Sequence, residues 1–165
     1  MALARLRNVD VLEMIASVIS NLVEGEFMQL RNSGKCLGNQ SLPKKYKSSD
    51  VETHPDFKYY IEKTFLKTAS LIAKACRASA ILGNASLEAS DAAYNYGRNF
   101  GIAFQLVDDM LDFVVSQDQF GKPVNADLSL GLATAPVLFA AQQFPELLPM
   151  ISRKFNQPND ASIVY

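Results

Sequence analysis

Residues that commonly build metal and redox sites are scarce in this chain of 165 residues, which has two cysteines, one histidine and no tryptophan. Cys36 and Cys76 lie far apart in the sequence and match no zinc or redox spacing, and His54 has no second histidine with which to share a metal. We predict that Cys76 is a small core residue and that Cys36 is a loop thiol. The low cysteine content favours a reducing compartment.

The chain also lacks an excess of charge and a long apolar run. Its 16 basic and 17 acidic residues give a formal net charge of −1, which gives no sign of a nucleic-acid-binding surface. No stretch of about 18 apolar residues occurs, so we predict no transmembrane segment, and residues 1–7 do not form the apolar core of a secretory signal. The hydrophobic content of 48% excludes a disordered tail.

The spacing of apolar residues predicts an all-α chain. Steps of three and four residues between apolar positions are typical of amphipathic helices. They cover residues 9–30, residues 56–82 and a third stretch that starts after Ser86 or Ser90 and runs to about Ser116. No stretch alternates convincingly between apolar and polar residues, as a half-buried strand would.

Two segments are predicted to end or separate these helices. Gly83 and Asn84 supply a stop for the second predicted helix. Residues 33–55 are rich in Gly, Ser, Lys, Asn and Pro, which predicts a solvated, flexible loop inserted between the first two helices. An apolar content that suits one core predicts a single domain over residues 1–165.

The third predicted helix carries a one-sided acidic stripe. Only four of the sixteen residues in 100–115 are polar, namely Gln105, Asp108, Asp109 and Asp112. At about 100° per residue, all four fall within an arc of about 100°. Like charges at these spacings repel, so a cation is expected between them.

Oxygen-only ligands without a neighbouring histidine or thiolate suit Mg²⁺, which completes its coordination with water and phosphate oxygens. An EF-hand calcium site is disfavoured, because that site is a loop with ligands at alternate positions. The alternative is a solvated polar face, which is what three acids on a helix usually form. Such faces interleave lysine or arginine, whereas residues 100–115 contain neither.

Cationic residues that could meet a phosphate lie elsewhere in the chain. Lys67 and Thr68 belong to the second predicted helix, although a solvated face with Lys63 and Lys74 is an equally good interpretation. Lys122 stands between Gly121 and Pro123 in a turn, where it is a plausible lid contact.

Four motifs resemble those of the trans-polyprenyl diphosphate synthases and occur in that family's order. Residues 104–112 closely resemble the second aspartate-rich motif, and the other three motifs lie at residues 24–29, at residues 63–69 and at residues 121–128. Residues 131–140 look most like the long-chain synthase subunits that make the side chain of ubiquinone. Leu132 stands where many relatives carry a lysine, a departure that fits the long-chain subgroup.

The resemblance implies an isoprenoid-synthase helical bundle and a Mg²⁺-dependent prenyltransferase. In that reaction an allylic diphosphate ionises and isopentenyl diphosphate attacks the carbocation head-to-tail. The resemblance implies that no residue is catalytic apart from the ligands of metal and diphosphate, and that Glu26 and Gln29 have packing or supporting roles. The implied Mg²⁺ ligands are Asp108, Asp109 and Asp112, and the implied allylic diphosphate contacts are Lys67, Gln105 and Lys122, with Thr68 in support.

The family uses two facing aspartate-rich motifs, and this sequence holds one. We therefore expect a partial polyprenyl synthase domain that exposes apolar surface and does not condense prenyl diphosphates in isolation. The resemblance also implies a mitochondrial location and a homo- or hetero-oligomer with a second synthase subunit. Two alternatives remain open: a non-catalytic helical partner of a complete synthase, and a terpene-cyclase-like enzyme, which the Gly-Lys-Pro turn disfavours.

Overall fold

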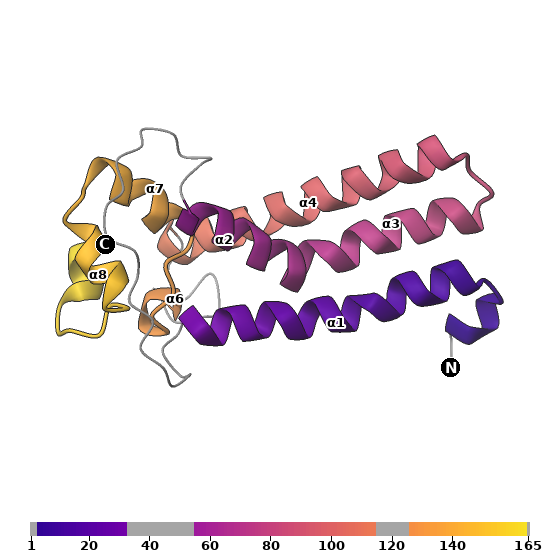
Figure 1. The fold of residues 1–165 in the computed structure, drawn as a ribbon. Coiled ribbons are helices and arrows are strands. Elements are labelled where there is room, and N and C mark those ends of the chain that lie inside the picture. Colours follow the sequence, from indigo (N-terminus) through magenta and orange to yellow (C-terminus); the bar gives the residue numbers. More distant parts are fainter. Residues whose placement is uncertain (1–2, 33–54, 115–125, 165) are drawn as a thin grey trace. The chain divides into compact units, whose positions relative to one another are not determined.

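The computed structural model describes residues 3–32, 55–114 and 126–164, and all regular elements in these ranges are helices (Figure 1). This result confirms the predicted all-α class. Most of the predicted loop at residues 33–55 lies outside the described residues, as do Cys36, His54 and Lys122. The helices are η1 (Leu3–Leu6), α1 (Val9–Asn32), α2 (Pro55–Thr64), η3 (Phe65–Ala69), α3 (Ser70–Leu82), α4 (Leu87–Val114), α6 (Ala126–Ser129), α7 (Ala135–Gln143), α8 (Leu147–Ser152) and α9 (Asp160–Val164).

Short side chains set the starts of two predicted helices. The backbone N–H of Val11 donates to Asn8 Oδ1 at 3.0 Å, so Asn8 caps α1. The backbone N–H of Ala89 donates to Ser86 Oγ at 3.2 Å, which shows that α4 begins after Ser86 rather than after Ser90.

The second predicted helix differs from expectation in its interior. It is divided into α2, the π-helix η3 and α3, whereas the apolar spacing predicted one uninterrupted α-helix. It ends at Leu82 as predicted, where the backbone N–H of Gly83 still donates to the Ser79 carbonyl and Asn84 adopts a left-handed conformation with φ of 55°.

The chain divides into two compact units. The first comprises Met1–Phe27 and Ile61–Gln105, and the second comprises Met28–Tyr60 and Leu106–Tyr165. The single domain predicted over residues 1–165 stays a prediction. In the described ranges, no helix is both long enough and apolar enough to cross a bilayer.

Small residues bring α4 into close contact with η3 and α3 in the first unit. A Cβ atom added at Gly101 would lie 2.5 Å from Ala69 Cα, and one added at Gly97 would lie 2.8 Å from Ala73 Cα. Only glycine fits at such a distance, so α4 packs directly on the backbone of η3 and α3.

A half-buried lysine joins α1 to α3 in the same unit. Lys74 Nζ donates to Ser17 Oγ at 2.7 Å. Burial lowers the pKa of Lys74, because the charged form loses hydration there. Cys76, predicted to be a core residue, is half-buried.

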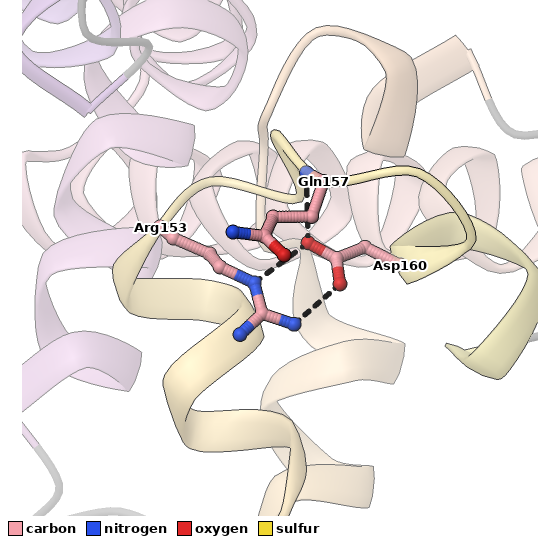
Figure 2. Close-up of polar contacts among 3 residues, drawn as sticks. All are labelled: Arg153, Gln157 and Asp160. Carbon is pink, nitrogen blue, oxygen red and sulfur yellow. Dashed lines mark hydrogen bonds and ion pairs between the residues drawn. The ribbon is translucent and has the colours of Figure 1, made fainter.

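The second unit has a core formed by α6, α7, α8 and the segment that follows them. Its buried members are Leu128, Val137, Ala141, Leu147, Met150 and Phe155. Next to this core, Arg153 Nε donates to Asp160 Oδ2 at 2.8 Å and Arg153 Nη2 donates to Oδ1 (Figure 2). The backbone N–H of Gln157 also donates to Oδ2, at 3.1 Å. The hydrogen bonds from Arg153, above all, lower the pKa of Asp160.

Candidate metal and diphosphate site

The three aspartates predicted as metal ligands lie on the last two turns of α4. Asp109 and Asp112 are only 4% and 8% exposed, and Asp108 is half-buried. A solvated polar face would leave such carboxylates in water. The burial of two of them is therefore evidence against that alternative, because buried carboxylates need hydrogen bonds or cations to offset their lost hydration.

Asp109 receives a hydrogen bond from a tyrosine of α2 in the same unit. Tyr60 Oη donates to Asp109 Oδ2 at 2.6 Å, and Tyr60 is 3% exposed. This length lies within the usual range of O–H···O hydrogen bonds. No local pattern in the sequence indicates Tyr60, which precedes Asp109 by 49 positions.

Asp112 receives a backbone donor from the helix that follows the acidic stripe. The N–H of Asp127, in the first turn of α6, donates to Asp112 Oδ2 at 3.2 Å. The start of a helix leaves N–H groups without partners in the helix, and a carboxylate stabilises that end. The acidic stripe and α6 are thus joined within the second unit.

The chemistry of this donor set fits a divalent cation that prefers oxygen, because α4 offers carboxylates and no imidazole or thiolate near them. The side chains do not converge on one point as they stand. Across the described ranges, no group of three or more His, Cys, Asp or Glu residues is arranged to hold a metal ion. Oδ2 of Asp109 accepts a hydrogen bond from Tyr60, and Oδ2 of Asp112 accepts one from the backbone N–H of Asp127.

Lys67 and Thr68, predicted to contact diphosphate, lie on the π-helix η3 of the first unit. Single-turn π-helices occur frequently at functional sites. Lys67 Nζ pairs with Glu26 Oε1 at 2.9 Å, and a Cβ added at Gly25 would lie 2.6 Å from Lys67 Cγ. The absence of a side chain at Gly25 therefore makes room for the aliphatic part of Lys67.

The lysines of this region do not form the solvated face that was the alternative interpretation. Lys63 is 7% exposed, and Lys67 and Lys74 are half-buried. Thr68 Oγ1 donates to Gln105 Oε1 at 3.0 Å, so the structure brings together two of the predicted diphosphate contacts. These residues belong to the first unit, and the three aspartates belong to the second.

The polyprenyl synthetase family matches residues 1–165, and the chain belongs to this family. It is 56% identical over 161 residues to a probable mitochondrial hexaprenyl pyrophosphate synthase of Neurospora crassa, covering 98% of this chain and 34% of that protein. It is 53% identical to decaprenyl-diphosphate synthase subunit 1 of Schizosaccharomyces pombe, covering 96% of this chain and 39% of that protein. The chain thus spans little more than a third of the length of these relatives.

A solved structure supports the same fold. The polyprenyl synthase of Caulobacter crescentus, complexed with calcium and isoprenyl diphosphate, has a TM-score of 0.73 and 29% identity. The similarity covers 98% of this chain and 45% of the Caulobacter chain. This similarity confirms the predicted isoprenoid-synthase fold. The Neurospora relative is named as a mitochondrial hexaprenyl synthase and the Schizosaccharomyces relative as a decaprenyl synthase subunit.

Proposed function

We propose that the protein to which this chain belongs is a long-chain trans-prenyl diphosphate synthase of mitochondria. It condenses isopentenyl diphosphate head-to-tail onto an allylic diphosphate and supplies the side chain of ubiquinone. The observation that carries this proposal is the family match along all of residues 1–165. The order of the motifs along the chain and the burial of the acidic stripe are consistent with it.

Asp108, Asp109 and Asp112 would hold Mg²⁺ through their carboxylate oxygens, directly or through water. The bound cation supplies Lewis-acid stabilisation of the charge that develops on the departing diphosphate. After the new carbon–carbon bond forms, a proton leaves C2 of the isopentenyl unit, and the departed diphosphate can accept it, so the proposal assigns no separate acid or base to the chain.

Lys67, Gln105 and Lys122 would bind the oxygens of the allylic diphosphate. Lys67 already carries a carboxylate partner at 2.9 Å, so a diphosphate would exchange with Glu26 for the same ammonium group. Thr68 would orient Gln105: its hydroxyl binds Oε1, which directs the Nε2 end of that amide away from Thr68.

The test is a product assay on the full polypeptide that carries residues 1–165. It is incubated with labelled isopentenyl diphosphate and farnesyl diphosphate, an allylic primer, with Mg²⁺ or with a chelator. We expect label in long-chain polyprenyl diphosphates only with Mg²⁺. A full-length polypeptide that folds and incorporates no label would contradict the proposal, and cyclic hydrocarbon products would favour the terpene-cyclase alternative.

The acidic stripe has its own test in the same polypeptide. Asp108→Asn should lower turnover by orders of magnitude if this carboxylate holds the metal. Asp91→Asn is the matched control, because Asp91 lies on the same helix, is exposed and pairs with Arg77 at 2.7 Å. Equal turnover in Asp108→Asn and the unsubstituted protein would remove Asp108 from the proposed site.

We also propose that the full protein forms a homo-oligomer, or a hetero-oligomer with a second synthase subunit. Purification from the native organism distinguishes this synthase from the alternative, a non-catalytic partner subunit. A 165-residue polypeptide that is inactive alone and bound to a complete synthase would support a partner subunit. Incorporation of isopentenyl diphosphate by the isolated 165-residue chain would contradict the expected inactivity of this portion.

A further inference from the structure

The hydroxyl groups of Tyr60 and of its neighbour Tyr59 donate to different kinds of acceptor. Tyr60 and Asp109 are 3% and 4% exposed, and the hydroxyl–carboxylate distance is 2.6 Å. The neighbouring Tyr59 Oη also makes a bond of 2.6 Å, but to the backbone carbonyl of Met28. Two adjacent residues of α2 therefore make bonds of equal length, one to the acidic stripe and one to the backbone.

Aromatic packing within the second unit holds the Tyr60 ring. The centroid of Phe57, one turn earlier on α2, lies 5.9 Å from that of Tyr60. Phe57 in turn meets Phe139 of α7 edge-to-face at 5.1 Å. These distances are those of favourable aromatic pairs, so the position of the Tyr60 hydroxyl is fixed by rings of two helices.

A carboxylate rotates readily about its last torsion, because that torsion has broad minima. It offers two oxygens with about four lone-pair positions. A donor fixed at one position therefore sets the plane of the group. The Tyr60 hydroxyl acts in this way on Oδ2 of Asp109, and partners that orient metal-binding side chains typically change metal affinity about 10–100-fold when they are removed.

We propose that Tyr60 is a positioning residue, which orients the Asp109 carboxylate for a divalent cation. This inference rests on the proposed function, in which Asp109 is a metal ligand. It adds a residue outside the aspartate-rich motif, from a helix early in the chain, and assigns it to the orientation of one carboxylate rather than to contact with substrate.

The test measures Mn²⁺ binding to the full polypeptide by electron paramagnetic resonance, with Mn²⁺ alone as a probe for a Mg²⁺ site. Tyr60→Phe keeps the ring and removes the hydroxyl, and it should weaken Mn²⁺ binding about tenfold or more. Tyr59→Phe is the matched control: it removes the same atom from the adjacent residue and should leave Mn²⁺ affinity unchanged. Equal affinities in Tyr60→Phe and Tyr59→Phe would overturn the inference.

Two further variants separate this inference from the proposed function. Asp109→Asn should itself weaken Mn²⁺ binding, and adding Tyr60→Phe to it should cause no further loss, because the carboxylate to be oriented is gone. A purely structural role for Tyr60 would give the same additional loss in both backgrounds. If Asp109→Asn binds Mn²⁺ as tightly as the unsubstituted protein, the proposed metal site is wrong. If Asp109→Asn weakens Mn²⁺ binding but Tyr60→Phe does not, the metal site stands and the positioning role of Tyr60 is wrong.

A second measurement leaves Tyr60 in place and so does not depend on the stability of Tyr60→Phe. The polypeptide is made with ring-deuterated tyrosine, and pulsed electron paramagnetic resonance of bound Mn²⁺ detects deuterium close to the ion. We expect deuterium modulation that persists in Tyr59→Phe. Bound Mn²⁺ without such modulation would show that no tyrosine adjoins the site, which would overturn the inference.

Discussion

The contact between Gly101 of α4 and Ala69 of η3 allows a quantitative prediction for the first unit. In Gly101→Ala the new Cβ would lie 2.5 Å from Ala69 Cα and 2.8 Å from Ala69 Cβ. Carbon atoms in favourable contact are about 3.5–4.0 Å apart. The helices must therefore separate by about 1 Å, because the nearest obstacle is a backbone atom that cannot rotate away.

The expected loss of stability follows from two opposing effects. Overpacking of this kind typically costs about 1–3 kcal/mol, and alanine in place of glycine inside a helix recovers about 1 kcal/mol. Because the obstacle is backbone, we expect the upper end of the first range and a net loss of about 2 kcal/mol. For a chain of this length, that loss corresponds to a fall in Tm of about 4–8 °C.

The same separation of the helices should break the hydrogen bond between Thr68 and Gln105, two of the residues predicted to bind diphosphate. Thr68 adjoins Ala69, and Gln105 lies one turn after Gly101, so the shift applies directly to their side chains. Their hydrogen bond of 3.0 Å would lengthen to about 4 Å, which is beyond hydrogen-bonding distance. The side-chain amide resonances of Gln105 should therefore move in the proton–nitrogen NMR spectrum of Gly101→Ala.

Chemical and thermal unfolding of the 165-residue chain measure the first effect, and Gly83→Ala is the control. Gly83 has a negative φ of −81°, and an added Cβ would meet only ordinary contacts, the nearest at 3.4 Å. Gly83→Ala should match or slightly exceed the unsubstituted chain, by up to about 1 kcal/mol. A Gly101→Ala chain as stable as Gly83→Ala, with unmoved Gln105 resonances, would refute the close packing of α4 on η3.

Two further predictions concern pH and association. The hydrogen bonds from Arg153 lower the pKa of Asp160, so this pair stabilises the fold above the carboxyl's unfolded pKa and loses that effect as pH falls through the folded value. The Tm of Asp160→Asn should therefore lie below that of the unsubstituted chain at neutral pH and approach it in acid; a gap that stays constant with pH would contradict the pairing. Phe100 and Phe104 are 51% and 57% exposed one turn apart on α4, and neighbouring exposed apolar groups promote association. Sedimentation should show less self-association for Phe104→Ser than for Leu87→Ser, a control that is 72% exposed at the start of the same helix, and equal association in both would exclude this surface.

Much of the helical fold could be predicted from the sequence, because amphipathic spacing and capping residues act locally. Apolar spacing predicted the start of α1 at Val9 and limited the start of α4 to the residue after Ser86 or after Ser90, and in the structure α4 starts at Leu87. The π-helix Phe65–Ala69 could not be predicted in this way, because its apolar spacing resembles that of the flanking helices. Ala69, its last residue, packs closely against Gly101, a contact that no local pattern encodes.

In the candidate site, the spacing of the aspartates could be predicted from the local sequence, but their hydrogen-bond partners could not. The spacing of Asp108, Asp109 and Asp112 placed them on one face, because four residues make about one turn of an α-helix. Their orientation is set by groups that the motif does not contain. Asp109 is held by a hydroxyl from α2, and Asp112 by a backbone N–H from α6.

Substitution of an aspartate and substitution of Tyr60 would affect the candidate metal site in different ways. A change at Asp108, Asp109 or Asp112 would remove a proposed ligand, whereas a change at Tyr60 would remove only the donor to Asp109 and leave every aspartate in place. The bond from Tyr60 joins residues 49 positions apart and lies almost wholly out of solvent. It therefore forms only once α2 has packed against α4 in the second unit, so the orientation of Asp109 depends on tertiary folding, while the spacing of the carboxylates depends on the helix alone.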